Sequence, residues 1–219
     1  MGKLIGFAAS FLLMPLIYSF GYEAYLFFAS SISLSRIDVF LYGCLCYALI
    51  HVMLGDRLIF IQLFEHELGH TIMAFVFFKD VREFAVHEQG GEVGYQGGSN
   101  LLIRLAPYYL PAFTIPLLII KPFVFPSIHQ GINFLIGLSL AFHYFFLYKE
   151  FRPSQPDIER TGLTLSFCVA CMMNTIFLVV ILCVVLDSYS TILSYFENSF
   201  VRSFELCKTV LQEWQASNP

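Results

Sequence analysis

Four ionisable side chains stand together at the start of an otherwise apolar run in this sequence. The segment FEHELGHTIMAFVFF, residues 64–78, holds Glu65, His66, Glu67 and His70. On a helix, two histidines four residues apart lie on one face, so both can bind one Zn²⁺ ion at about 2.0–2.1 Å. Glu67 then lies beside the ion, where it can take a proton from zinc-bound water and deliver it to a leaving amine. The motif predicts a metalloprotease centre with one zinc ion per chain.

The apolar setting of this motif also favours a functional role. Ionisable side chains inside a membrane span are costly and usually mark functional sites. The alternative is a polar helix end whose histidines are simply hydrogen-bonded. Two histidines and two glutamates within six residues would, however, make a poor lipid-facing helix. Gly69 has no side chain, so another backbone segment can approach the helix at that level.

The predicted zinc site still lacks a ligand, because a catalytic zinc ion usually has three protein ligands and one open position. The candidates outside the motif are His51, His87, His129, His143, Asp157 and the remaining acids. In a protein with six spans, the loops at 79–100 and 149–162 lie on the same side, and HELGH lies towards that side. Because Asp157 lies in a loop on that side, it is favoured as the third ligand. His143 is the rival candidate.

The segment SQPDIERTG around Asp157 must enter the protein if it is to reach the motif. Pro153 and Pro156 prevent a continuous helix there, and irregular backbone is tolerated at membrane depth where it is buried or lines a water-filled cavity. The alternative is that Asp157 is a solvated loop acid, paired with Arg152 or Arg160 in a weak surface ion pair.

The amino-acid composition indicates what kind of protein holds these residues. Of 219 residues, 58% are hydrophobic and 13% are charged, whereas soluble domains average about 45–50% and about 25%. A net charge of −4 without any basic run argues against nucleic acid as a partner. Most of the six cysteines lie in apolar runs, which indicates buried thiols rather than disulfides. We therefore expect an all-α polytopic membrane protein in contact with a lipid bilayer.

Six apolar runs are long enough to be membrane-spanning helices. They cover roughly 4–29, 38–54, 58–78, 101–120, 131–148 and 163–186. We interpret the first as a retained helix, since it exceeds the usual length of a signal-peptide core. Together the six predict one membrane domain at 1–187. The tail at 188–219 has apolar residues at helical spacing, which predicts an amphipathic helix in the membrane interface or on a partner.

Three other features bear on the expected site. Glycines next to short mixed runs, in REFAVHEQGGEVGYQ, predict a short β-hairpin within 79–100, close to the active site. Asn174 lies deep in an apolar run and could donate to a developing oxyanion, although a hydrogen bond between helices is the preferred interpretation. His143 could line the cavity, but a lone histidine among aromatics is more typical of a hydrogen-bonded packing residue.

The chain resembles a known family at several of these motifs. HELGH within a span, followed by a glycine-rich polar loop and a late aspartate before a terminal span, is similar to the site-2 protease family of intramembrane zinc metalloproteases. LAPYYLP at 105–111, FHYFF at 142–146 and QPDI at 155–158 resemble a small bacterial branch of that family. The resemblance covers roughly 60–175, and no loop is long enough for a PDZ domain.

The resemblance implies specific roles for four residues. By matching position, His66, His70 and Asp157 would bind zinc, and Glu67 would be the catalytic acid and base. The family's aspartate usually stands in a DG dipeptide, whereas here the segment reads PDIERTG. The family also implies that a transmembrane substrate unwinds and pairs with a strand edge, for which 84–96 is the candidate.

These observations predict an intramembrane endopeptidase that cleaves a membrane protein in or near its transmembrane segment. The alternatives are an inactive membrane scaffold of the same fold and a transporter of metal ions or protons. An intact Glu67 favours the enzyme over the scaffold, and polar residues at one level argue against a conduction path. A small excess of Lys and Arg in the loops at 30–37, 79–100 and 149–162 predicts that the site opens to the cytoplasm. We expect a multi-pass protein of the bacterial plasma membrane.

Overall fold

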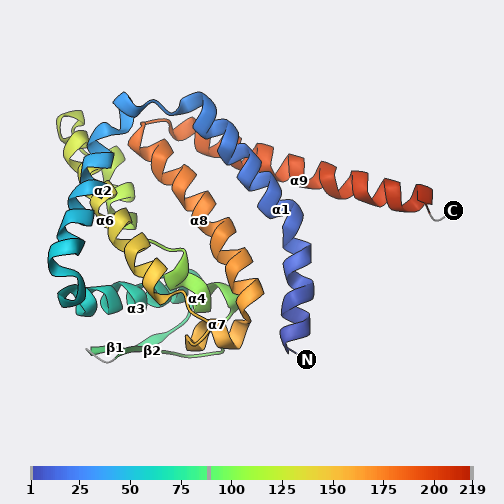
Figure 1. Ribbon diagram of the computed structural model, residues 1–219, viewed down its shortest axis with the longest axis horizontal. Helices are drawn as coiled ribbons and strands as arrows, with labels where there is room; N and C mark the ends of the chain where they lie inside the picture. The colour runs from blue at the N-terminus through green and yellow to red at the C-terminus, as the bar shows by residue number, and fades with distance from the viewer. Residues whose placement is uncertain (1, 88–89, 218–219) are drawn as a thin grey trace. The chain divides into compact units, whose positions relative to one another are not determined.

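The chain is mostly helical, with one small antiparallel sheet (Figure 1). The computed structural model describes residues 2–87 and 90–217. The longer helices are α1 (Gly2–Ser31), α2 (Leu34–Leu54), α3 (Ile59–Val76), α6 (His129–Glu150), α8 (Leu163–Val185) and α9 (Tyr189–Ser217). The chain divides into two compact units, Met1–Ser33 with Thr161–Pro219, and Leu34–Arg160. The HELGH motif and Asp157 both belong to the second unit.

The described residues contain four helices that are long and apolar enough to cross a membrane. They are Gly6–Ser31, Leu34–Leu54, Pro126–Glu150 and Leu163–Val185. The prediction of an all-α membrane protein with a small hairpin is therefore supported, whereas six spans are not. The predicted spans at 58–78 and 101–120 are the two that are missing.

The predicted span at 101–120 is wrong because it is not one helix. It consists of α4 (Leu101–Leu105), the 3-10 turn η2 (Ala106–Tyr108) and α5 (Thr114–Ile120), followed by the short turns η3 (Lys121–Phe123) and η4 (Pro126–Ile128). Pro107 and Pro111 lie in the interrupted part. Each removes a backbone donor and its ring clashes with the preceding turn, so the apolar run is broken into short pieces instead of forming one spanning helix.

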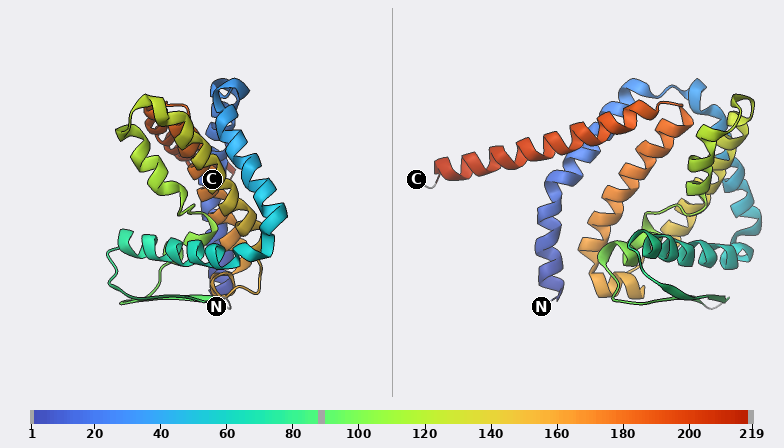
Figure 2. Two further views of the ribbon diagram at one scale, coloured as in Figure 1. Left: turned by 90° about the vertical axis from the view of Figure 1, so that its left-hand side faces the viewer. Right: turned by 180° about the vertical axis from the view of Figure 1, so that it is seen from behind.

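The helix predicted at 58–78 does form, as α3, but it lies crosswise to α2 and α6 in the second unit (Figures 1 and 2). It follows the short turn η1 (Gly55–Leu58). Four polar side chains on different sides of α3 are buried, namely Gln62, Glu65, Glu67 and Thr71. A lipid-facing span would place such side chains in hydrocarbon, whereas here the surrounding protein covers them.

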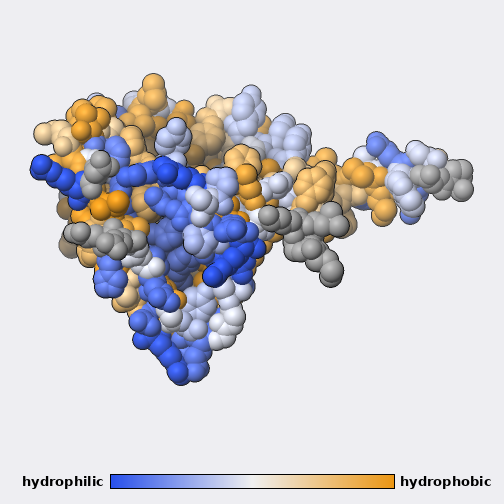
Figure 3. Space-filling model, turned by 60° about the horizontal axis from the view of Figure 1, so that its bottom comes forward, coloured by the Kyte–Doolittle hydropathy of each residue, from blue (hydrophilic) through white to orange (hydrophobic). Residues whose placement is uncertain are grey.

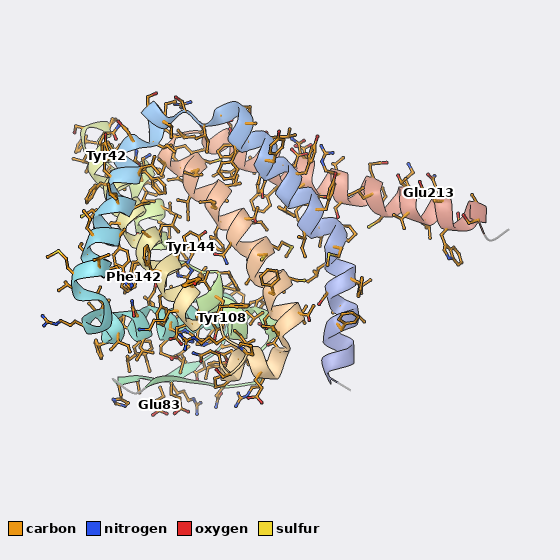
Figure 4. The ribbon with its side chains drawn as sticks, in the orientation of Figure 1. Tyr42, Glu83, Tyr108, Phe142, Tyr144 and Glu213 are labelled. Carbon is orange, nitrogen blue, oxygen red and sulfur yellow. The ribbon has the colours of Figure 1, made fainter. Side chains whose placement is uncertain are left out.

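Helices α2 and α6 form the closest packed pair of the second unit. A Cβ atom on Gly43 would lie 2.9 Å from the backbone nitrogen of Leu138, and one on Gly137 would lie 3.2 Å from that of Cys44. Real Cβ atoms rarely come so close, so both glycines are needed for the backbones to meet. Next to this contact, Phe142 of α6 (Figure 4) packs against Tyr47 of α2.

The predicted hairpin is present and lies along α3. Strand β1 (Val81–His87) pairs antiparallel with β2 (Gly90–Tyr95), with an irregularity between Val81 and Glu83. Figure 3 shows the molecule with the lower part of Figure 1 turned forward, where β1, β2 and the short helix α7 (Pro156–Thr161) lie. The centre of this face is largely hydrophilic.

The first unit contains α1, α8 and α9. Arg202 of α9 donates to Glu23 of α1 at 2.8 Å, and its guanidinium lies 4.1 Å from the centre of the Tyr22 ring. These contacts hold α9 against α1 by a charge-assisted hydrogen bond and a cation–π interaction. A helix thus covers most of the tail at 188–219, and its place in a membrane interface stays a prediction.

Candidate metal centre

Three predicted ligands converge at one point of the second unit. Nε2 of His70 lies 3.3 Å from Oδ2 of Asp157, and Nε2 of His66 lies 3.8 Å from the same oxygen. Two ligands bound to tetrahedral zinc at about 2.0–2.1 Å are themselves about 3.3 Å apart. Within the described residues this is the one cluster of three His, Cys, Asp or Glu side chains close enough to share an ion. Its donors and spacing could hold a metal ion.

Asp157 reaches the histidines because the chain breaks after α6. Residues 151–155 are not helical, and α7 then begins at Pro156. Proline suits the first position of a helix, where its missing N–H would have no helical partner. Asp157 follows immediately and faces the cleft beside α3. The irregular segment predicted between 149 and 162 is therefore what brings the carboxylate to the motif.

His70 is oriented by a hydrogen bond from its other ring nitrogen. Nδ1 lies 2.8 Å from the carbonyl oxygen of Ile103, and a carbonyl only accepts, so Nδ1 carries the proton. Nε2 then faces Asp157 at 3.3 Å, and once it gives up its proton it would offer a lone pair to a metal ion, as metal-binding histidines do. Asn100 fixes the position of Ile103, because its side chain accepts from the Ile103 backbone N–H at 2.8 Å and caps α4.

His66 is held by aromatic rings. The ring of Tyr108 (Figure 4) lies 5.6 Å from that of His66, and the ring of Phe146 lies 6.1 Å away, both edge-on. Edge-on ring contacts of this kind are favourable. The backbone of Pro107 also lies close to α3, since a Cβ on Gly69 would be 3.3 Å from it. The close approach predicted at Gly69 is therefore made by η2, the segment that carries Tyr108.

Glu67 lies directly under strand β2. A Cβ atom on Gly91 would be 2.6 Å from Oε1 of Glu67, so the carboxylate occupies the space that any other residue at 91 would need. Burial raises the pKa of Glu67, and the neighbouring His66 and His70 oppose that rise. A carboxyl group with a raised pKa is better suited to accept and return a proton near neutral pH.

The pKa of Asp157 is shifted in the opposite direction. Burial alone would raise it, but hydrogen bonds and charge interactions with His66 and His70 outweigh burial and hold the pKa well below its usual range. The carboxyl group is therefore ionised at neutral pH, as a metal ligand must be. The two acids beside the histidines thus differ, with Asp157 suited to binding a cation and Glu67 to proton transfer.

A cleft of about 670 Å³ opens beside the three ligands. Its walls come from α3, from the length of β2 and from α7. Arg104, Arg160, Glu92 and Glu150 also line it, so its polar wall carries both signs of charge.

The remaining predicted candidates lie elsewhere. Nδ1 of His143 lies 3.5 Å from Oε2 of Glu65, and His143 is not part of the three-residue cluster. His51 contacts the Tyr47 hydroxyl at 3.3 Å. Asn174 belongs to α8 in the first unit, where its side chain donates to the Ala170 carbonyl at 2.8 Å.

His87 and His129 are also outside the cluster among the described residues. His87 is the last residue of β1. Nε2 of His129 lies 3.3 Å from the carbonyl oxygen of Val124, so its ring caps the turn that precedes α6. Of the candidates for the third ligand that lie within residues 2–87 and 90–217, Asp157 alone joins the two histidines of the motif.

Three contributors to the site were not expected from the sequence. They are the missing side chain of Gly91, the carbonyl of Ile103 and the ring of Tyr108. The glycine pair in EQGGEVGY was a usable signal, because a strand with two adjacent glycines often marks a close backbone approach. A backbone carbonyl carries no sequence signal, and Tyr108 is one of twelve tyrosines in the chain.

Comparison with known proteins returned no match. No family model, no curated protein and no solved structure matches this chain. The function is therefore argued from the residues and their geometry.

Proposed function

We propose that this chain is an intramembrane zinc metalloprotease of the site-2 protease type. It would hydrolyse a peptide bond in or near a transmembrane segment of a membrane protein. The observation that carries the proposal is the convergence of His66, His70 and Asp157 beside Glu67, at a cleft bordered by a β-strand. Four apolar helices of spanning length support a membrane setting.

Each residue of the site has a defined task in this proposal. His66, His70 and Asp157 would bind one zinc ion, which would polarise the scissile carbonyl and make a water molecule more acidic. Glu67 would accept the proton of the attacking water and return it to the nitrogen of the leaving amine. The rings of Tyr108 and Phe146 would hold His66 in place, and the carbonyl of Ile103 would do the same for His70.

Strand β2 is the proposed binding site for the substrate. Its residues 90–93 and Tyr95 line the cleft, and β1 is its partner in the two-stranded sheet. The other edge of β2 can pair with an unwound peptide, since main-chain hydrogen bonds then replace those lost from the substrate helix. Because β2 passes over Glu67, a peptide added there lies next to the proton acceptor.

The decisive test replaces Glu67 by an amide of the same shape. Glu67→Gln is expected to keep one zinc ion per chain and to lower proteolysis about 10²- to 10⁴-fold, because an amide cannot accept the proton. Zinc is measured by elemental analysis of the purified full chain. Proteolysis is measured by comparing membrane-protein fragments in cells that express the variant or the wild type.

Glu83→Gln is the matched control. Glu83 lies on the hairpin (Figure 4) but not among the residues that line the cleft, so its amide variant should cleave like the wild type. Cleavage by Glu67→Gln at the wild-type rate would rule out the assigned mechanism. Zinc binding with no cleavage even by the wild type would support the inactive scaffold. Metal flux into vesicles that is equal in both proteins would support the transporter.

A further inference from the structure

A second polar contact lies on the side of α3 that faces α6. Oε2 of Glu65 is 3.5 Å from Nδ1 of His143, and both side chains are 2% exposed. Glu65 immediately precedes the zinc ligand His66, and His143 lies in a helix of membrane-spanning length. The proposed zinc mechanism uses neither residue.

The stability of the fold does not account for this contact. Both carboxylate oxygens of Glu65 and Nε2 of His143 lack hydrogen-bond partners among the described residues. Buried groups of this kind are costly, and replacing a buried charged pair by apolar residues often leaves a protein as stable or makes it more stable. The best-attested benefit of such a pair is that it selects one arrangement of the helices that carry it.

The same two helices meet again one turn further along. Phe146 follows His143 by three residues on α6, and its ring packs edge-on against His66 at 6.1 Å. On α3, His66 follows Glu65 directly. The polar contact and the ring contact therefore hold neighbouring residues of α3 against neighbouring turns of α6. Any rotation of α3 that separates Glu65 from His143 also moves His66.

A small rotation is enough to affect a metal site. A side chain on a helix extends about 6 Å from the helix axis, so a turn of about 10° moves its end by about 1 Å. Metal–ligand distances are held to within about 0.2 Å. Phe146 and Tyr108 contact the His66 ring itself. The contact between Glu65 and His143 lies on the neighbouring residue of α3, where it can restrain the rotation of the helix.

We propose that Glu65 and His143 are positioning residues, whose buried contact sets the rotation of α3 and so directs His66 towards the shared ion. This inference rests on the proposed zinc site. It assigns the contact no role in binding the ion or the substrate. The pair acts through His66, and its loss should change the geometry of the bound metal as well as the affinity.

The test uses cobalt(II) as a probe, because its visible absorption reports ligand geometry in a zinc site. The full chain is purified in detergent and titrated with cobalt. Glu65→Gln and His143→Gln are each expected to bind cobalt at least about tenfold more weakly, as loss of an orienting contact usually does, and to shift the absorption bands. Because the two residues act together, the double variant should bind no more weakly than the weaker single variant.

Ser139→Ala is the matched control on the same helix. Ser139 makes a buried 2.9 Å hydrogen bond with Thr114 of α5, so its loss perturbs α6 without touching α3. It should leave cobalt affinity and spectrum unchanged. The proposal is overturned if Glu65→Gln and His143→Gln bind cobalt as the wild type does, or if Ser139→Ala produces the same loss.

A second variant covers the case in which a single change unfolds the chain. Glu65→Leu combined with His143→Leu removes both buried polar groups, and a positioning role predicts a folded chain with a displaced spectrum. Wild-type cobalt binding by this pair, or failure of this pair to fold, overturns the proposal. If the wild type itself binds no cobalt, the proposed zinc site has failed; if it binds and the variants match it, only the positioning role has failed.

Discussion

The two polar groups of α3 use similar side chains and differ in access to water. His66, His70 and Asp157 lie 3.3 and 3.8 Å apart beside an open cleft. Glu65 and His143 lie 3.5 Å apart and are almost completely buried. The spacings are nearly the same, so distance alone does not identify a metal site. A third ligand and an open side distinguish the first group from the second.

The geometry of one helix separates these two groups. Successive residues are about 100° apart around an α-helix, so His66 and His70 project about 100–140° away from Glu65. Glu67 lies still further round, under β2. One short segment can therefore supply metal ligands, a proton acceptor and a packing contact on three different sides, provided that protein surrounds it on all of them.

Removal of the metal is the strongest way to separate the two groups. A chelator such as phenanthroline should abolish proteolysis by the wild type, because the proposed zinc ion would polarise the scissile carbonyl. Adding zinc back should restore proteolysis. The buried contact between Glu65 and His143 binds no ion in this proposal, so the chelator should leave it intact. Activity is followed on a membrane-protein substrate in detergent. Full activity in a chelated sample with no zinc would contradict the proposed function.

Loss of one ligand should have the next largest effect. Asp157→Ala is expected to weaken zinc binding by at least about a hundredfold, more than the loss of an orienting contact, and therefore by more than His143→Gln. Zinc affinity is measured by competition with a chromophoric chelator. Glu159→Ala, an exposed acid on the same helix, is the control and should bind zinc normally. A larger loss in the His143 variant would transfer the ligand role to His143.

A smaller effect is expected from the strand above Glu67. Gly91→Ala places a methyl group where the Glu67 carboxylate lies, so either β2 or the carboxylate must shift. Proteolysis should fall about tenfold or more, as a misplacement of about 1 Å can cost up to a hundredfold, while zinc stays bound. Gly98→Ala, whose added methyl group would meet open space, is the control. Equal activity in the two variants would show that the clash has no catalytic consequence.

The smallest effect on the site should come from the contact between α2 and α6. Gly137→Ala drives a methyl group into the backbone of α2, and overpacking of this kind costs about 1–3 kcal/mol. Thermal unfolding should therefore begin at a lower temperature, while cobalt spectra of the folded protein stay normal. Gly131→Ala on the same helix meets no neighbour and should unfold no earlier than the wild type.

The parts of the site that could be predicted from the sequence are those carried by side-chain identity and spacing. The histidines of HELGH are one turn apart on any helix, and the prolines around Asp157 mark the break that frees it. The hairpin was also predictable, since its glycines lie next to mixed polar and apolar runs. These features depend on local backbone geometry, which a short segment largely determines.

The features that the sequence did not reveal depend on contacts between distant segments. Hydropathy predicts that 58–78 and 101–120 are apolar, but not that α3 lies crosswise or that the second run is broken around Pro107 and Pro111. The partner of His143 was equally hidden, because Glu65 lies 78 residues earlier in the chain. The burial of the contact between Glu65 and His143 became apparent only from the packing of α3 on α6.

The packing of His66 against Phe146 also has a consequence for where a substrate is cut. Helix α6 has 22 residues, so at 1.5 Å per residue it is about 33 Å long, close to the thickness of a bilayer core. Phe146 lies four residues, about 6 Å, before its end at Glu150. In the proposed function, with α6 spanning the membrane, water would reach the centre from the nearby membrane surface without crossing the hydrocarbon. The bond that is cut is accordingly expected within a turn or two of the end of the substrate's own apolar segment, and not at its middle.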